Sequence, residues 1–340
     1  MAASDFSATG APATAAESAT ALGDAKTVLE HFVEAGIDAI DLWRGASDLR
    51  YALAVQPVAS PVHRGTMHAS ATVAAGGRRW FLQRTLDDVA PLVDECAAAA
   101  AATRAGELGV APRVLARDAA TGTVVYEHLP EGSRWCRVDD LAEPTVLDAA
   151  LAAKRVLHAS PPLGAPRDPF AAVEAHLVLA REREVALPGD HAWLDHQVRM
   201  IAAAIAAAPA DIAPCHGDGA ASNVILTPGG EVLLIDFDAA GDADPCYDVG
   251  ALLLEACETE TAIKATLERM RGGRDRATLA RCRLYGIVDD VRWGLWGRLA
   301  AALSDRPTVE FFKYGEWRLL RARHNLRDRR LAAWLRELRG

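Results

Sequence analysis

The chain has 340 residues, of which 51% are hydrophobic, and a formal net charge of −9. This size and composition predict a soluble globular protein with either two lobes or one large core. The acidic balance argues against general binding to nucleic-acid backbones, and no uninterrupted apolar run is long enough to predict a membrane span.

The six cysteines form neither a C-x-x-C pair nor a metal-binding spacing. They are therefore predicted to be free thiols of a protein in a reducing cytoplasm. Residues 1–25 are predicted to form a disordered tail, because the first 22 are rich in Ala, Ser and Thr and lack the basic start of a signal peptide.

The elements that follow the tail predict a small β-rich lobe. Apolar residues at helical spacing predict a helix over 26–37, with Gly36 as a stop. Three β-prone segments separated by Pro, Gly and His then predict the first strands of a small sheet, at 51–55, 69–73 and 80–82.

An Ala-rich helix is expected to begin at Glu95, and a strand over 123–127 runs into a Pro/Gly turn. We place the lobe boundary here, with an N-terminal lobe over 26–129 and a larger lobe over 130–340. The second lobe begins with helical patterns, at 147–158 and between 168 and 208. His158, at the end of the first of them, is interpreted as a packing or capping residue.

The segment from His216 to Asp236 carries the strongest functional pattern, H-x-D-x-x-x-x-N followed by Leu-Ile-Asp-Phe. Transfer of a phosphoryl group from ATP needs a carboxylate that accepts the proton of the attacking hydroxyl and oxygen ligands for Mg²⁺. Asp218 is the candidate base, and Asn223 and Asp236 are the candidate metal ligands.

Two short β-prone runs, 224–226 and 232–235, are joined by the turn signal Thr-Pro-Gly-Gly. The predicted hairpin would bring Asn223 and Asp236 close together. The alternative, that these residues only cap a turn and end a strand, fits each residue singly but not the full spaced set.

The chain after Asp248 is predicted to be helical, with breaks at 272–273 and 305–307. Trp293 and Trp296 lie three residues apart and so share one helix face, where their rings could meet a cationic ligand. Aromatic residues at helical spacing are also common in cores, and both interpretations stay open.

The spaced set at 216–236 resembles the catalytic segment of the aminoglycoside phosphotransferase and choline kinase superfamily, relatives of the protein kinases. The resemblance covers roughly residues 64–323. It implies an α+β, bilobal protein-kinase-like fold, with a small antiparallel sheet lobe that binds nucleotide and a larger, mostly helical lobe that binds the acceptor.

The resemblance also implies nucleotide-binding positions in the first lobe. A cation on the third strand should pair with a glutamate on the next helix; Arg84 and Glu95 are the candidates, although simple alignment puts Gln83 at the cation's position. The loop around Gly65 could cover the phosphates or be a plain hairpin loop. The backbone from Glu127 to Leu129 would hold the adenine.

On the acceptor side, the resemblance to choline and ethanolamine kinases implies an aromatic site of Trp293, Trp296 and Tyr314, with Glu255 as partner of a substrate cation. Choline kinases usually have asparagine at the position of Gly217, whereas the aminoglycoside enzymes often have glycine. An aminoglycoside acceptor would instead need an open acidic cleft, for which Asp238, Asp289 and Asp290 are candidates.

The sequence thus predicts an ATP- and Mg²⁺-dependent phosphotransferase acting on a hydroxyl of a small, cationic alcohol, with choline or ethanolamine as first candidates. Phosphorylation of an aminoglycoside, another antibiotic or a sugar is the alternative. A pseudokinase-like binding module is the alternative from another class, motivated by the missing strand-three lysine. Oligomeric state is left open.

Overall fold

The computed structural model describes residues 15–55, 58–60, 63–89, 92–208, 210–306 and 308–339. Helix α1 (Ala15–Asp38) contains the predicted helix and begins inside the segment predicted as a tail. Residues 1–14 of that predicted tail lie outside the described residues.

A five-stranded antiparallel sheet, in the order β1-β4-β5-β7-β6, follows α1. Its strands are β1 (Arg50–Val55), β4 (His68–Ala75), β5 (Arg78–Thr85), β6 (Val114–Asp118) and β7 (Thr123–Glu127). Gly76 and Gly77 form the two-residue turn between β4 and β5, and both have positive φ, as a tight hairpin with the twist of the sheet requires.

The two faces of this sheet have different neighbours. Apolar residues of β4 and β5, such as Val73 and Leu82, pack with Val33 of α1 on one face. The alternate residues Thr72 and Gln83 line a cavity on the other face. Helix α2 (Glu95–Glu107) connects β5 to β6.

Between β1 and β4 the chain forms a second hairpin, β2 (Val58–Ser60) with β3 (His63–Gly65). It reaches the helical part of the molecule, where the backbone N–H of Arg64 donates a hydrogen bond to Ser222 Oγ at 3.2 Å. The hairpin is therefore a bridge between the two parts.

The rest of the chain is mostly helical and carries two small sheets, β11-β10-β8 and β12-β9. Its strands are β8 (Arg134–Trp135), β9 (Ala213–Cys215), β10 (Val224–Leu226), β11 (Val232–Leu234) and β12 (Gly241–Ala243). Its helices are α3 (Val138–Ala142), α4 (Pro144–His158), α5 (Pro169–Glu182), α6 (His191–Ala207), α7 (Pro245–Ala256), α8 (Glu260–Arg271), α9 (Arg276–Leu303), α10 (Phe311–Leu326) and α11 (Leu331–Glu337).

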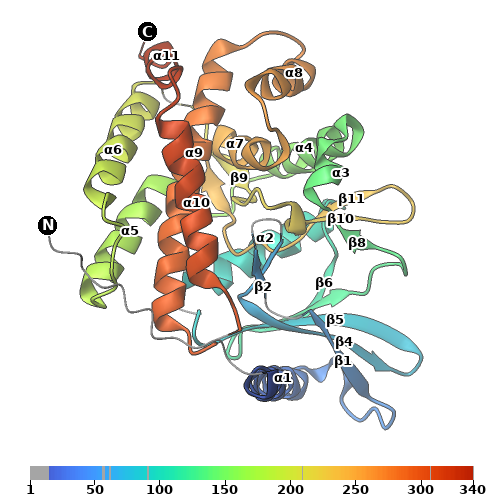
Figure 1. The fold of residues 1–340 in the computed structure, drawn as a ribbon. Coiled ribbons are helices and arrows are strands. Elements are labelled where there is room, and N and C mark those ends of the chain that lie inside the picture. The colour runs from blue at the N-terminus through green and yellow to red at the C-terminus, as the bar shows by residue number, and fades with distance from the viewer. Residues whose placement is uncertain are drawn as a thin grey trace, which may run out of the picture.

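Figure 1 shows the five-stranded sheet at the lower right with α1 beneath it, and α9 and α10 side by side through the centre. Helices α5 and α6 flank this pair on one side, and α7, α8 and α4 lie on the other. Both predicted helix breaks are confirmed, since α8 ends at Arg271 and α9 at Leu303.

One apolar core runs across both parts. Trp293, Trp296 and Phe311 of the helical part are buried in one cluster with Met67 and Leu86, which flank the sheet. The α+β architecture of a small sheet lobe and a larger helical lobe is thus confirmed. No helix in the described part of the chain combines the length and the apolar character that crossing a membrane requires.

Candidate functional site

A cavity of about 450 Å³ lies between the sheet and the helical part. Strands β4 and β5 form one wall with Ser70, Thr72, Phe81 and Gln83. The segment after β7 and the loop before β10 supply other walls. Of the predicted site residues, the cavity is lined by Gly65, Glu127, Leu129, Asn223 and Asp236.

The loop between β9 and β10 carries the predicted base. Gly217 has φ +74°, and a Cβ atom there would overlap the carbonyl of Ala239. Only glycine fits this position without moving the backbone.

Asp248 of α7, which is fully buried, anchors this loop. Its carboxylate accepts hydrogen bonds from Lys154 Nζ at 2.6 Å, from His158 Nε2 at 2.9 Å, and from the backbone N–H groups of His216 and Gly217 at 3.0 Å each. Burial alone would raise the pKa of Asp248, but the charge of Lys154 and the hydrogen bond from His158 hold it far below its usual range.

Lys154 also donates a hydrogen bond to the backbone carbonyl of Asp218 at 2.9 Å. Lys154 and Asp248 therefore fix both ends of the short segment that presents the Asp218 side chain. His158 belongs to this support, in agreement with its interpretation as a structural residue.

The His216 ring closes the loop against the hairpin. Nε2 lies 2.8 Å from the carbonyl of Ile235, and the ring packs edge-on against Phe237 at 4.8 Å between centroids. Burial lowers the pKa of His216 to about 4, so the ring is neutral at pH 7 and carries one N–H. The carbonyl of Ile235 at 2.8 Å from Nε2 is a nearer acceptor for it than the carbonyl of Asp218 at 3.2 Å from Nδ1.

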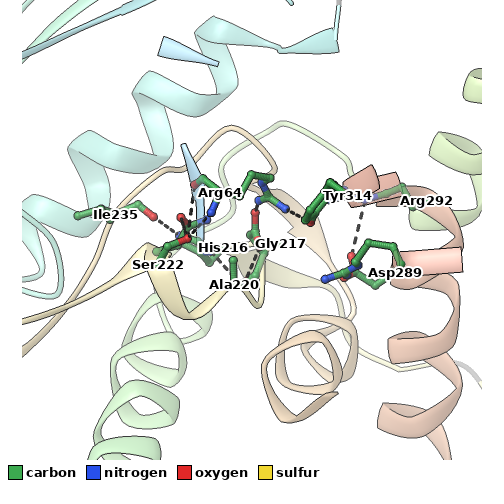
Figure 2. A network of polar contacts seen from close by, with 12 residues as sticks. Arg64, His216, Gly217, Ala220, Ser222, Ile235, Asp289, Arg292 and Tyr314 are labelled. Atoms are coloured by element: carbon green, nitrogen blue, oxygen red, sulfur yellow. Dashed lines mark hydrogen bonds and ion pairs between the residues drawn. The ribbon is translucent and has the colours of Figure 1, made fainter. Parts of the chain in front are cut away.

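Asp218 itself is buried, and its Oδ1 accepts a hydrogen bond from Ala220 N at 2.9 Å. Its Oδ2 forms an ion pair with Arg64 of β3. Figure 2 shows Arg64 between the loop that carries Asp218, with Ser222 and Gly217, and Tyr314 of α10.

The guanidinium of Arg64 fills the predicted aromatic site. It lies 3.6 Å from the ring centroid of Trp293 and 5.9 Å from that of Tyr314, and it donates a hydrogen bond to the Tyr314 hydroxyl at 2.9 Å. Trp296 packs edge-on against both rings, at 5.2 Å from Trp293 and 6.0 Å from Tyr314. The three predicted aromatic residues thus form one cluster, and that cluster already contacts a cation.

The predicted hairpin of β10 and β11 is confirmed and brings Asn223 beside Asp236. Asp236 has φ +64°, a conformation that costs a non-glycine residue free energy and that often occurs at functional sites. The carboxylates of Asp236 and Asp238 and a ring nitrogen of His68 lie within 4.8 Å of one another.

Burial raises the pKa of Asp238 to about 7; the facing His68 opposes this rise and the charge of Asp236 adds to it. A buried oxygen of Asp238 and the buried side-chain nitrogen of Asn223 lack hydrogen-bond partners in the described part of the chain. The carboxylate oxygens of Asp236 and Asp238 fit a hard cation such as Mg²⁺.

The expected pair of Arg84 and Glu95 is not formed. Alternation along β5 turns Arg84 to the α1 face, where it donates hydrogen bonds to the carbonyls of Thr121 at 3.1 Å and Phe32 at 3.2 Å. Glu95 lies on the opposite face, in a smaller hollow that Gln83 and His68 also line. The residues of this strand that line the cavity are therefore Phe81 and the neutral Gln83.

The backbone that was expected to hold adenine borders the cavity from Tyr126 to Leu129. The side chain of Glu127 is fixed by the segment before β6, since its Oε1 accepts a hydrogen bond from Arg113 N at 2.8 Å. Gly65 lines another part of the cavity, at the end of β3, where it pairs with Val58 at the start of β2.

Among the described residues, the ion-pair partner of Glu255 is an arginine and not a member of the aromatic cluster. Glu255 pairs with Arg321 at 3.2 Å, and Arg321 also binds Asp290 at 2.8 Å. Asp289 is buried and pairs with Arg318 at 2.6 Å. The open acidic cleft expected for an aminoglycoside is thus replaced, at Asp289 and Asp290, by buried carboxylates whose charge is neutralised by arginines.

Sequence reasoning missed Arg64, Lys154 and the supporting role of Asp248. No local pattern marks Lys154, which lies in an ordinary helix more than sixty residues before its partners. Arg64 directly precedes Gly65 in the loop that was expected to cover the phosphates. Its place beside Gly65 was the one local feature that could have marked it as a site residue.

Comparison with known proteins gives a consistent result. The phosphotransferase enzyme family matches residues 59–285. None of the curated proteins compared with this chain matches it.

The fold is similar to that of a choline/ethanolamine kinase family protein from Mesorhizobium loti, with a TM-score of 0.73, 23% identity, and 92% of this chain and 99% of that chain covered. Choline kinase LicA from Streptococcus pneumoniae has a TM-score of 0.68 and 18% identity, with 87% and 99% covered. Aminoglycoside phosphotransferase APH(4)-Ia has a TM-score of 0.56 and 17% identity, with 91% and 98% covered.

These likenesses show the protein-kinase-like fold that the sequence predicted, and the family match covers most of the chain, including both parts of the site. The chain belongs to the phosphotransferase enzyme family.

Proposed function

We propose that the protein transfers the γ-phosphoryl group of ATP to the hydroxyl of a small alcohol that carries a cationic group, with choline and ethanolamine as the first candidates. One observation carries the choice of acceptor. The aromatic cluster beside Asp218 holds a guanidinium 3.6 Å from the Trp293 ring, so the position next to the base is built to bind a cation.

Asp218 is the proposed base. Its carboxylate would orient the acceptor hydroxyl and take its proton as the bond to phosphorus forms, while ADP leaves. The support from Lys154 and Asp248 favours this role, because a base must be held in a fixed position to align the attacking oxygen.

Asn223 and Asp236 are the proposed Mg²⁺ ligands, with Asp238 close enough to assist. The bound cation would neutralise charge on the phosphates. The adenine would lie against the backbone from Glu127 to Leu129. Solved structures with the same fold have been obtained with AMP, in LicA, and with AMP-PNP and hygromycin B, in APH(4)-Ia.

Within the same chemistry, Gly217 is the feature that favours an aminoglycoside. Against it stands the pairing of Asp289 and Asp290 with Arg318 and Arg321, which leaves little negative charge for a polycationic substrate. A binding module without catalysis is favoured by the neutral Gln83 and opposed by the complete set of Asp218, Asn223 and Asp236.

The test measures ADP formation by the purified protein with Mg²⁺ and ATP across choline, ethanolamine, thiamine, several sugars and kanamycin. We expect turnover with choline or ethanolamine. In Asp218→Asn turnover should fall by at least about a hundredfold, a typical share for a positioned base, while AMP-PNP affinity measured by calorimetry stays. Turnover with kanamycin alone would reject the cationic alcohol, and unaltered turnover in Asp218→Asn would reject the base.

A further inference from the structure

Arg64 stands where the nucleotide cavity meets the aromatic cluster. Together with Gly65 and Thr66 it lines the cavity, yet its guanidinium reaches Asp218 and Tyr314 on the acceptor side. The side chain is 4% exposed, so water screens its interactions with Asp218 and Tyr314 only weakly.

The cavity is short of cations. Among the described residues that line it, only Arg64 and Arg134 are arginine or lysine. Arg134 lies beside Trp135 and is held by Asp140 through two bonds of 2.6 and 2.7 Å. Arg64 alone is next to the loop of Ser222 and Asn223, where the phosphates would meet the metal ligands.

Arg64 also blocks the reaction in its present position. Its ion pair occupies the carboxylate that must accept a proton, and its guanidinium fills the place proposed for the acceptor cation. The backbone of Arg64, in contrast, is fixed by hydrogen bonds with Ser222 Oγ at 3.2 and 3.4 Å. A change of side-chain rotamer can therefore move the charge while the backbone stays.

Building on the proposed function, we propose that Arg64 is the phosphate anchor of this protein and that ATP draws it away from Asp218, which opens the aromatic site to the acceptor. A triphosphate offers Arg64 several charged oxygens with the planar geometry that a guanidinium binds best, whereas Asp218 offers one carboxylate. The anchor that other kinase-like proteins carry on the third strand would here come from the covering hairpin.

This arrangement couples nucleotide binding to cation binding. A cation and Arg64 cannot share the Trp293 ring, so nucleotide that removes Arg64 must raise the affinity for the cation. By linkage the cation raises the affinity for nucleotide by the same factor.

The experiment is calorimetry on the full chain with two probes, AMP-PNP with Mg²⁺ and tetramethylammonium, a cation that has no hydroxyl to phosphorylate. Arg64→Gln is compared with Arg79→Gln, which makes the same change at an exposed position of β5, and with Arg64→Lys, which keeps the charge. Circular dichroism checks that each variant is folded.

For the wild type we expect AMP-PNP to raise tetramethylammonium affinity by at least about tenfold, the effect of one charged contact. Arg64→Gln should bind AMP-PNP at least about tenfold more weakly and should bind tetramethylammonium without nucleotide. Arg64→Lys should recover part of the nucleotide affinity, and Arg79→Gln should match the wild type.

Equal AMP-PNP affinity in wild type and Arg64→Gln would overturn the anchor. Equal tetramethylammonium affinity with and without AMP-PNP, or no tetramethylammonium binding in either case, would overturn the opening of the site. If Arg64→Gln does not fold, Arg64→Lys and the wild-type coupling decide alone. Failure of the proposed function is separate, because it would appear as absent turnover with every alcohol and leave both binding comparisons intact.

Discussion

At the scale of single residues, the buried pair of Lys154 and Asp248 stabilises the loop that carries Asp218. The side chains are 1% and 0% exposed, so removing the lysine leaves an uncompensated carboxylate inside the protein. Lys154→Met should lower the free energy of unfolding at pH 7 by about 3–5 kcal/mol in urea titration. Lys313→Met, at an exposed pair with Glu310, should cost at most about 1 kcal/mol.

The pH dependence of that difference tests the cause. The pKa of Asp248 is lower in the folded than in the unfolded protein, so the wild type gains stability above about pH 4 and loses it as pH falls further. In Lys154→Met the Asp248 carboxylate has lost the charge of its lysine partner and can take up a proton, which relieves the cost of its burial. The stability gap between the two proteins should therefore narrow from pH 7 toward pH 4. A constant gap would assign the loss to packing.

At the scale of elements, the alternation of side chains along β5 gives Arg84 and Gln83 different roles. Arg84 supports the α1 face of the sheet, and Gln83 lines the cavity. Arg84→Met should cost about 1–3 kcal/mol of stability, because the carbonyls of Phe32 and Thr121 lose their donor, while AMP-PNP affinity stays. Gln83→Leu should leave the stability unchanged and lower the affinity for AMP-PNP. Calorimetry with both variants would contradict this assignment if Arg84→Met were the one that lost nucleotide.

The same strand shows where sequence information ends. The β-pattern of 80–82 correctly predicted a strand, but a shift of one residue decides which side chain faces the cavity, and only the partner strands fix that register. The hairpin of 224–234, in contrast, was predictable in detail, because its turn and the spacing of Asn223 and Asp236 are local features.

Charge pairs between residues far apart in the sequence could not be predicted from local sequence features. Trp293, Trp296 and Tyr314 were correctly grouped from helical spacing and the family resemblance. The cation that fills their cluster comes from a hairpin 250 residues before Tyr314. Glu255 was expected to pair with a substrate cation, but it pairs with Arg321, which no local pattern indicates.

At the scale of the whole molecule, Arg306 joins the helical part to the sheet part beside the covering hairpin. Its Nε lies 2.7 Å from Asp88, and its Nη1 donates to the carbonyl of Thr66 at 2.7 Å, two residues after Arg64. These contacts hold the hairpin against the helices and so help keep Arg64 on Asp218.

Arg306→Gln should therefore loosen the hairpin without unfolding either part. We expect amide hydrogen exchange over residues 63–67 to quicken by at least about tenfold, since one charged contact with two acceptors is lost, while residues 78–85 keep their protection. Arg298→Gln is the matched control, because Arg298 binds Glu316 and Ala186 within the helical part. Asp88→Asn should reproduce the effect from the other partner. Unchanged exchange at 63–67 would mean that the two parts are held together by the apolar core of Trp293, Phe311 and Met67 and not by Arg306. Faster exchange across the whole sheet would contradict a local effect on the hairpin and would mean that Arg306 stabilises the sheet as a whole.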